Sequence, residues 1–323
     1  MQVRELPTNN RRHARRQFFQ EAATIEGFSW FDRLHGFLYI TFPYLYIEVG
    51  TGNHWLAKAV IPLLNAWSKL HPKKHDTRLH SLTVKSRTIA DTYHGKALPL
   101  ESAKTLVQVK EDIHIEDLEQ VIPYVDARAL IMHHPDHIVV LDCPCREAQE
   151  NPCLPLDVCL IVGEPFASYV LAHHPEKSRQ INAAEAEKIL EEEDQRGHVH
   201  HAFFKDAMLG RFYAICNCCA CCCGAMRAHR NAVPMLASSG YLVSVAQQQC
   251  QACGTCVTYC QFGALALLDG VLQVNEAECM GCGVCVSKCE QGALSLQLAP
   301  EKGAPFELSQ LMEQAANKVS ALP

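Results

Sequence analysis

The sequence predicts an α/β central domain, a C-terminal α+β domain organised by two cysteine runs, and a helical, aromatic-rich N-terminal region. Two observations predict this arrangement. From about residue 97 onward, short strand-like apolar runs alternate with helical patterns, and after residue 240 one cysteine spacing occurs twice. At 323 residues the chain is long enough for two domains with a substantial core. We expect the units 1–96, 97–240 and 241–300, followed by a C-terminal helix at 301–323.

The N-terminal region combines helical patterns with clustered aromatic residues. His54–Leu70 places apolar side chains on one face of an amphipathic helix. Leu34–Ile47 is rich in Phe and Tyr, but it is too short to span a bilayer. We interpret Leu34–Ile47 as a buried segment or a protein interface, with peripheral membrane contact as the alternative. The basic stretch 71–96 is interpreted as solvated surface, and a docking patch for an acidic redox partner is the second interpretation.

The central domain shows alternating strand and helix signals. Asn182 and Glu185 have the spacing of a capping box, and Gly197 is a suitable C′ residue for the helix that they open. A linker is expected around residues 238–248. The other expected elements are a helix at Asp126–His134 and strands at His137–Asp142, Asp157–Val162 and Arg211–Ile215.

The C-terminal domain contains two copies of a C-x2-C-x2-C-x3-C run. A cubane iron–sulfur cluster needs four thiolates, and in proteins with two such clusters the fourth cysteine of each run binds the other cluster. Zinc sites instead pair two C-x2-C units across a longer gap, which disfavours zinc here. The spacing therefore predicts two [4Fe-4S] clusters, one held by Cys250, Cys253, Cys256 and Cys289 and the other by Cys279, Cys282, Cys285 and Cys260.

The two runs belong to an internal repeat. Both are followed by Gly-Ala-Leu, and the apolar segment between them contains Asp269-Gly270, a strong hairpin signal. The segment from about Val243 to Leu298 resembles a bacterial two-cluster ferredoxin domain, which implies a ferredoxin-like fold with two clusters. That family has Pro after the fourth cysteine, where this chain has Gln261 and Glu290. The change leaves the ligands intact but alters hydrogen bonding around the clusters.

Ten further cysteines lie between residues 143 and 223, in two groups that each follow a predicted strand. They can ligate one further cubane with spare thiols, two further cubanes or one larger cluster. The alternatives are inert buried thiols or a structural zinc ion. Neighbours such as Cys218 and Cys219 diverge, so we do not expect the whole run 216–223 to face one metal. The first candidate ligand set is Cys143, Cys145, Cys153 and Cys159, and the next is Cys216, Cys218, Cys219 and Cys222.

Arg146 and His200 are the catalytic candidates. We interpret Arg146 as a donor to a cluster sulfide or an anionic substrate, or equally as half of a structural ion pair. His200 is interpreted as a ligand or proton donor. The sequence has no c-type haem motif, no radical-SAM cysteine set, no P-loop and no dinucleotide-binding glycine motif. These absences argue against an autonomous flavin or nicotinamide enzyme.

The central domain contains three further motifs: Cys143-Pro144-Cys145-Arg146 followed by Cys153 and Cys159, then Gly197–His200, and Ile215–Cys223, which reads I-C-N-C-C-x-C-C-C. Through these motifs, residues 97–298 resemble a family of bacterial and archaeal dicluster ferredoxin-like proteins. The family commonly has Leu where this chain has His198. The resemblance implies iron–sulfur cofactors in addition to the C-terminal ferredoxin domain.

The cysteine usage also indicates a compartment. Eighteen cysteines grouped as metal ligands favour a reducing, cytoplasmic environment over a secreted disulfide scaffold. Arg15-Arg16 begins a twin-arginine-like sequence, but Gln20, Glu21 and Glu26 interrupt the apolar stretch that an export signal needs. The formal net charge of −6 does not favour a nucleic-acid partner.

Three functions fit these features. The first is electron transfer, in which the two C-terminal clusters relay single electrons to or from an additional iron–sulfur site in the central domain. The second is a reductase whose catalytic cluster is held by the central cysteines. The third is a non-catalytic redox subunit or cluster-assembly factor that docks through the aromatic N-terminal region. We expect a redox partner protein, and the sequence leaves the oligomeric state open.

Overall fold

A mixed β-sheet forms the centre of the fold. The computed structural model describes residues 10–25, 27–52, 54–57, 93–115, 118, 121 and 130–313. The strand order is β2-β3-β4-β7-β6-β1-β8, β5 also pairs with β3, and every pairing is antiparallel except β1 with β8. The strands are β1 (Tyr93–Leu98), β2 (Ile113–Ile115), β3 (Leu130–Asp142), β4 (Asp157–Glu164), β5 (Ser178–Ile181), β6 (Val199–Lys205), β7 (Arg211–Cys218) and β8 (Leu236–Ala237).

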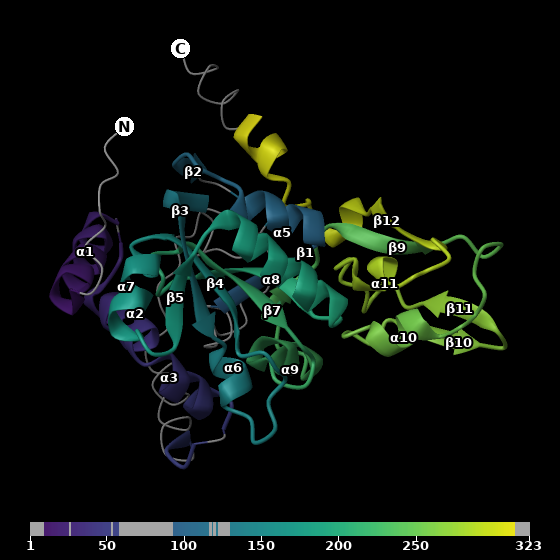
Figure 1. The fold of residues 1–323 in the computed structure, drawn as a ribbon, viewed down its shortest axis with the longest axis horizontal. Coiled ribbons are helices and arrows are strands. Elements are labelled where there is room, and N and C mark those ends of the chain that lie inside the picture. The colour runs from purple at the N-terminus through teal and green to yellow at the C-terminus, as the bar shows by residue number, and fades with distance from the viewer. Residues whose placement is uncertain are drawn as a thin grey trace, which may run out of the picture.

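Both faces of this sheet are covered. Along β3, Val139 and Leu141 enter one hydrophobic core, whereas Ile138 and Val140 enter the other, because successive strand residues point to opposite faces. Figure 1 shows helices in layers around the strands. The first face is covered by α1 (Arg11–Thr24), α2 (Trp30–Thr41), α3 (Pro43–Gly50), α7 (Phe166–His173) and α9 (Gly224–Arg230), and the second by α5 (Leu100–Val107) and α8 (Ala183–Gln195).

The structure confirms most of the expected central elements. The three predicted strands lie within β3, β4 and β7, and Asn182 caps α8 by accepting a hydrogen bond from the Glu185 amide. The expected helix at Asp126–His134 is wrong over residues 130–134, because these residues begin β3 and pair with β2 and β4. The expected linker at 238–248 is also wrong at 241–245, which form a strand paired with residues 294–298.

Some predictions concern residues outside the described part of the chain. Residues 58–92 include most of the expected helix His54–Leu70 and of the basic stretch 71–96. Of the expected C-terminal helix at 301–323, residues 300–302 form a short 3-10 turn and residues 308–313 are helical, and the description ends there. None of the helices in the described segments has the length and apolar character needed to cross a membrane.

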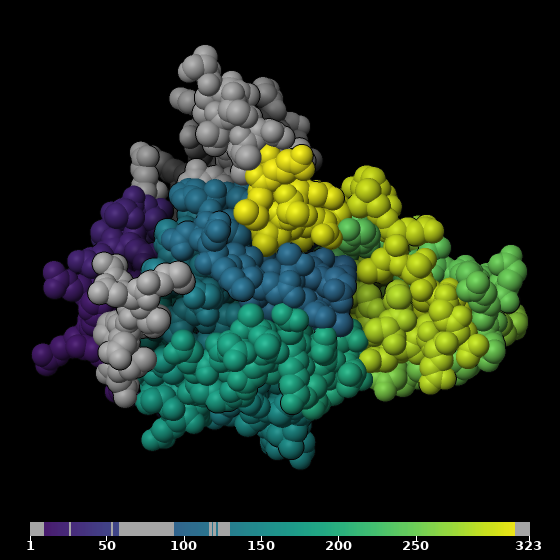
Figure 2. All heavy atoms as spheres, turned by 45° about the horizontal axis from the view of Figure 1, so that its top comes forward, coloured from purple at the N-terminus to yellow at the C-terminus, as the bar shows by residue number. Residues whose placement is uncertain are grey.

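Residues 241–298, the C-terminal module, form two small repeated halves at one end of the molecule (Figure 2). The two-stranded sheets are β9 with β12 and β10 with β11. Asp269 and Gly270, which join β10 to β11, both have positive φ, as the hairpin signal predicts. The elements are β9 (Tyr241–Val245), α10 (Thr255–Tyr259), β10 (Leu265–Leu268), β11 (Val271–Val274), α11 (Val284–Ser287) and β12 (Leu294–Leu298).

The module packs against the turn that follows α8. Gly197 has a φ of +84°, and a Cβ there would lie 2.4 Å from the Tyr259 ring, so this close approach requires glycine. The Gln261 amide donates to the Gly197 carbonyl at 2.9 Å and accepts from the Ala220 N–H at 2.8 Å. Lys288 lies 3.7 Å from the Asp194 carboxylate. These contacts fix the module against α8, the turn that follows it and the loop after β7.

Candidate metal centres

Each half of the C-terminal module encloses a cavity lined by four cysteines. The first module cavity has about 380 Å³ of empty space, and the second about 360 Å³. The first is lined by Cys250, Cys253, Cys256 and Cys289, and the second by Cys260, Cys279, Cys282 and Cys285. These are the two crossed sets that the spacing predicts, so each cavity offers four sulfur ligands, which is the donor set of a [4Fe-4S] cluster.

Glycines in the left-handed region create the bends at these cavities. Gly254 and Gly283 have φ values of +80° and +84° and stand at the N-caps of α10 and α11. This conformation is costly for residues with a Cβ, and it turns the chain so that Cys256 and Cys285 follow in the first helical turn. The Ala264 N–H donates to the Cys260 sulfur at 3.2 Å, and amide donors of this kind stabilise thiolates.

The two module cavities differ in their exposure. Cys253 is exposed, and its hydrogen bonds with Thr255 lower the pKa of its thiol. Cys282 occupies the equivalent position in the second half, where burial raises the pKa of its thiol to about 12. The second cavity is also lined by Phe262 and Met280, which contact the core of the central domain. The first cavity therefore opens toward solvent, and the second lies toward the central domain.

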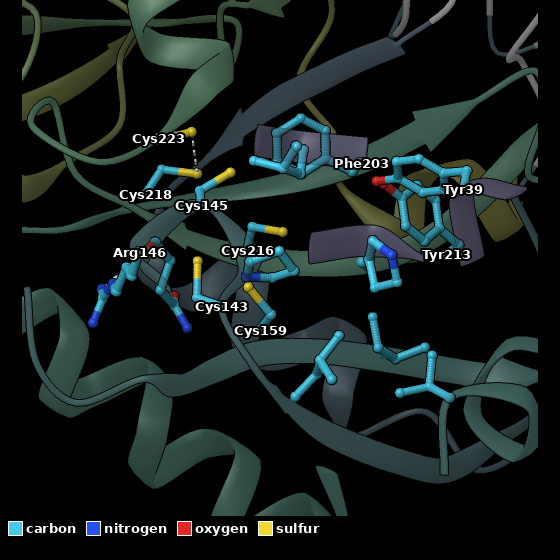
Figure 3. Close-up of a pocket in the computed structure, with 18 of the residues that line it drawn as sticks. Tyr39, Cys143, Cys145, Arg146, Cys159, Phe203, Tyr213, Cys216, Cys218 and Cys223 are labelled. Atoms are coloured by element: carbon cyan, nitrogen blue, oxygen red, sulfur yellow. Dashed lines mark hydrogen bonds between the residues drawn. The ribbon is translucent and has the colours of Figure 1, made fainter. Parts of the chain in front are cut away.

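Six of the ten central cysteines form a continuous group. Cys216 and Cys218 stand two residues apart on β7 and so share a face, next to Cys159 on the neighbouring strand β4. Figure 3 shows the sulfur atoms of the group gathered around one cavity. Thiol hydrogen bonds join this six-thiol set in the order Cys216, Cys159, Cys143, Cys145, Cys223 and Cys218.

The six thiols are held in an apolar environment. The hydrogen bond between Cys143 and Cys145, with burial as a further cause, raises the pKa of Cys143 to about 12. Hydrogen bonds with Cys143 and Cys216, together with burial, raise the pKa of Cys159 as well. Four of the six cysteines are buried and two are partly buried. Six such thiolates without a cation would carry a large desolvation cost, whereas bound metal favours the thiolate form. The donor set therefore suits a group with several metal ions.

The cavity around the six-thiol set, the central cavity, is larger than the two module cavities. It contains about 830 Å³ of empty space. The N-terminal helices close it from one side, and the hydroxyls of Tyr39 and Tyr213 meet at 2.7 Å in its wall (Figure 3). Apart from the cysteines and Arg146, the lining is mainly apolar and aromatic, including Phe166, Phe203 and Met208.

The other four central cysteines form the four-thiol set, Cys153, Cys219, Cys221 and Cys222. Their sulfur atoms all lie within 4.8 Å of one another. Cys153 and Cys221 are 3.1 Å apart, and Cys221 and Cys222 are 3.6 Å apart. Cys219 and Cys222 are buried and also contact the central cavity, whereas Cys221 is exposed. The site is therefore reachable from solvent on one side.

The structure regroups the candidate ligands of the central domain. It brings Cys143, Cys145 and Cys159 together, but Cys153 lies with Cys219 and Cys222 instead. The expected second set is likewise divided, because Cys216 and Cys218 join the six-thiol set. The sequence reasoning omitted Cys221 and Cys223. The spacing of two residues along β7 predicts that Cys216 and Cys218 share a face. No local pattern predicts that Cys223, which follows the next turn, lies beside them.

Arg146 and His200 lie near these thiols in different ways. Arg146 lines the central cavity and is 1% exposed, and its guanidinium forms an ion pair with Glu193 and contacts the carbonyls of Pro155 and Asn217. His200 on β6 contacts the Asn217 amide oxygen on β7 at 2.6 Å, and it is not among the residues that line the central cavity. Arg146 therefore forms a structural ion pair, which is one of the two interpretations given for it above. A catalytic role for Arg146 or His200 stays a prediction.

One family of known proteins matches part of the chain. A 4Fe-4S binding domain matches residues 272–295, a segment that contains Cys279, Cys282, Cys285 and Cys289. No curated protein matches the chain. The match indicates 4Fe-4S binding in a ferredoxin-like C-terminal region, and together with the clustered central cysteines it supports an iron–sulfur protein.

Proposed function

We propose that this chain is a cytoplasmic iron–sulfur electron-transfer protein. Two [4Fe-4S] clusters in the C-terminal module relay single electrons to or from an additional iron–sulfur site held by the six-thiol set. Cys250, Cys253, Cys256 and Cys289 would hold one module cluster, and Cys260, Cys279, Cys282 and Cys285 the other. Bound clusters of this type supply one-electron transfer at potentials set by burial, charge and hydrogen bonds to sulfur.

The observation that carries this proposal is the contact between the second module cavity and the loop after β7. Gln261 directly follows Cys260, and its side chain accepts a hydrogen bond from Ala220, which directly follows Cys219. Cys219 contacts the central cavity. A short path of covalent and hydrogen bonds thus joins a cysteine of the second module cavity to the wall of the central cavity.

The exposure of the first module cavity supports it as the place where electrons enter or leave the protein. Cys253 is exposed at that cavity, whereas the second cavity abuts the central domain. We propose that a redox partner protein approaches the Cys253 side, because electron exchange between proteins requires a cluster close to the surface. Lys288, which lines the first cavity, is held near Asp194 of the central domain rather than presented to the partner.

A second candidate function is a reductase that acts in the central cavity. The size of this cavity favours it, since about 830 Å³ is more than twice the 380 Å³ or 360 Å³ of the module cavities. The part of the central cavity wall that is not formed by cysteines is mainly aromatic and apolar, which suits a small apolar substrate beside the metal group.

Counting iron and sulfide in the anaerobically reconstituted protein, with EPR, tests the electron-transfer proposal. We expect about twelve irons per chain or more, with signals from a centre that differs from the two module clusters. About eight irons with signals of module clusters alone would refute the additional site. A change of the central EPR signal on adding small ligands would favour the reductase, because a fully thiolate-ligated carrier has no open iron position.

A further inference from the structure

The four-thiol set differs in spacing from the module cavities. All four of its sulfur atoms lie within 4.8 Å of one another, and among the described residues no other group of His, Cys, Asp or Glu side chains meets this spacing. The two module sets, which have the sequence pattern of cubane ligands, do not meet this spacing. The four-thiol set therefore differs in geometry from the two module sets.

Bond lengths show what this spacing fits. In a tetrahedral site with Zn–S bonds of about 2.3 Å, the sulfur atoms lie about 3.8 Å apart. A cubane binds each thiolate to a different iron, so that its ligand sulfurs stand roughly 6 Å apart. Close sulfur pairs occur in both central sets, since Cys153 and Cys221 are 3.1 Å apart and Cys218 and Cys223 are 3.3 Å apart. What fits one ion in the four-thiol set is that all four sulfur atoms lie within 4.8 Å of one another, below the spacing of cubane ligands.

The surroundings also suit a site with four thiolates. The backbone N–H of Cys222 donates to the Cys219 sulfur, as in the tight turns that wrap a metal ion. Arg230 donates to the Ala220 carbonyl between two of the ligands, which brings a positive charge beside the loop. Cys153 comes from the segment between α6 (Pro144–Glu147) and β4, far along the chain from the other three. A shared ion would close a long loop, which is where a metal crosslink contributes most.

We infer that Cys153, Cys219, Cys221 and Cys222 bind a single tetrahedral Zn²⁺ ion rather than an iron–sulfur cluster. The ion joins the Cys153 segment to the loop after β7. It thereby closes one wall of the central cavity and holds Ala220 in position for its hydrogen bond to Gln261. Four thiolates leave no open position on the ion, so the role is structural. Zinc has no redox chemistry, so this role is independent of whether the module transfers electrons.

Two exposed cysteines provide a matched pair of variants for the test. The protein is purified anaerobically from zinc-supplemented cells, and zinc and iron per chain are measured by mass spectrometry. We expect about one zinc in the wild type, with four sulfur neighbours at about 2.3 Å in X-ray absorption at the zinc edge. Cys221→Ala should lower zinc occupancy in a competing chelator at least about tenfold and leave iron unchanged. Cys253→Ala should leave zinc unchanged and lower iron by about four atoms.

A third variant and the zinc absorption spectrum distinguish the loss of a zinc ligand from a folding defect. Cys153→His should retain zinc, because three cysteines and one histidine also form a structural zinc site. Wild-type protein without zinc, a zinc edge with fewer than four sulfur neighbours, or loss of iron in Cys221→Ala would each overturn the inference. Failure of electron transfer with zinc still present would instead count against the proposed function alone.

Discussion

Replacing Gln261 with Ala should loosen the C-terminal module from the central domain. The side chain makes two hydrogen bonds across the contact, from the Ala220 N–H at 2.8 Å and to the Gly197 carbonyl at 2.9 Å. Each such bond contributes about 1 kcal/mol net, so the variant should weaken docking by about 2 kcal/mol. That free energy corresponds to roughly a 30-fold larger population in which the module is displaced.

Hydrogen–deuterium exchange with mass spectrometry measures this effect under anaerobic conditions. The Ala220 amide loses its acceptor, so a peptide covering residues 216–223 should exchange roughly 30-fold faster at that amide. Glu290→Ala is the matched control, because Glu290 follows the fourth cysteine of the other run and is exposed. Unchanged exchange in Gln261→Ala, or an equal increase in Glu290→Ala, would refute the docking role of Gln261.

Two further predictions concern the first module cavity and a buried hydrogen bond. Cys253→Ala should remove about four irons and the EPR signal of one module cluster while the central signal remains, and loss of the central signal as well would contradict separate sites. Glu164→Gln should lower the free energy of unfolding by about 2 kcal/mol at pH 7, since Glu164 accepts a 2.5 Å hydrogen bond from His137 in the core. Burial opposes ionisation of Glu164, but hydrogen bonds from His137 and Ser168 lower its pKa below the ordinary value of 4.5. The stabilisation is therefore present above pH 4.5 and is lost as the pH falls through the folded pKa. The free energies of unfolding of wild type and variant, measured in urea, should converge in acid. A difference that stays constant with pH would contradict this prediction.

Local chemistry was sufficient to predict several elements. Asp269-Gly270 forms the expected hairpin turn because both residues tolerate positive φ. Asn182 caps α8 through its own side chain, and the helix ends before Gly197, which has a φ of +84°. These features depend on residues close together in the sequence, so they can be recognised without knowledge of the fold.

Elements that depend on distant partners were predicted less well. The local pattern at residues 130–134 favours a helix, but pairing with β2 and β4 makes these residues the start of β3. The local pattern at residues 241–245 favours a linker, but these residues form β9 because β12, about fifty residues later, supplies the other strand of the pair. In both segments the tertiary pairing outweighs a weak local preference.

The cysteines show the same division most clearly. The sequence by itself predicted which cysteines line each module cavity, because each C-x2-C-x2-C-x3-C run places three cysteines within one short loop and the repeat predicts that the fourth belongs to the other half. The division of the central cysteines into six and four was decided by tertiary structure. Antiparallel pairing of β4 with β7 brings Cys159 beside Cys216, and the turn after β7 sends Cys219, Cys221 and Cys222 to Cys153. Sequence spacing specifies ligands within one loop, whereas ligands from separate strands and loops meet only where the sheet and its connections place them.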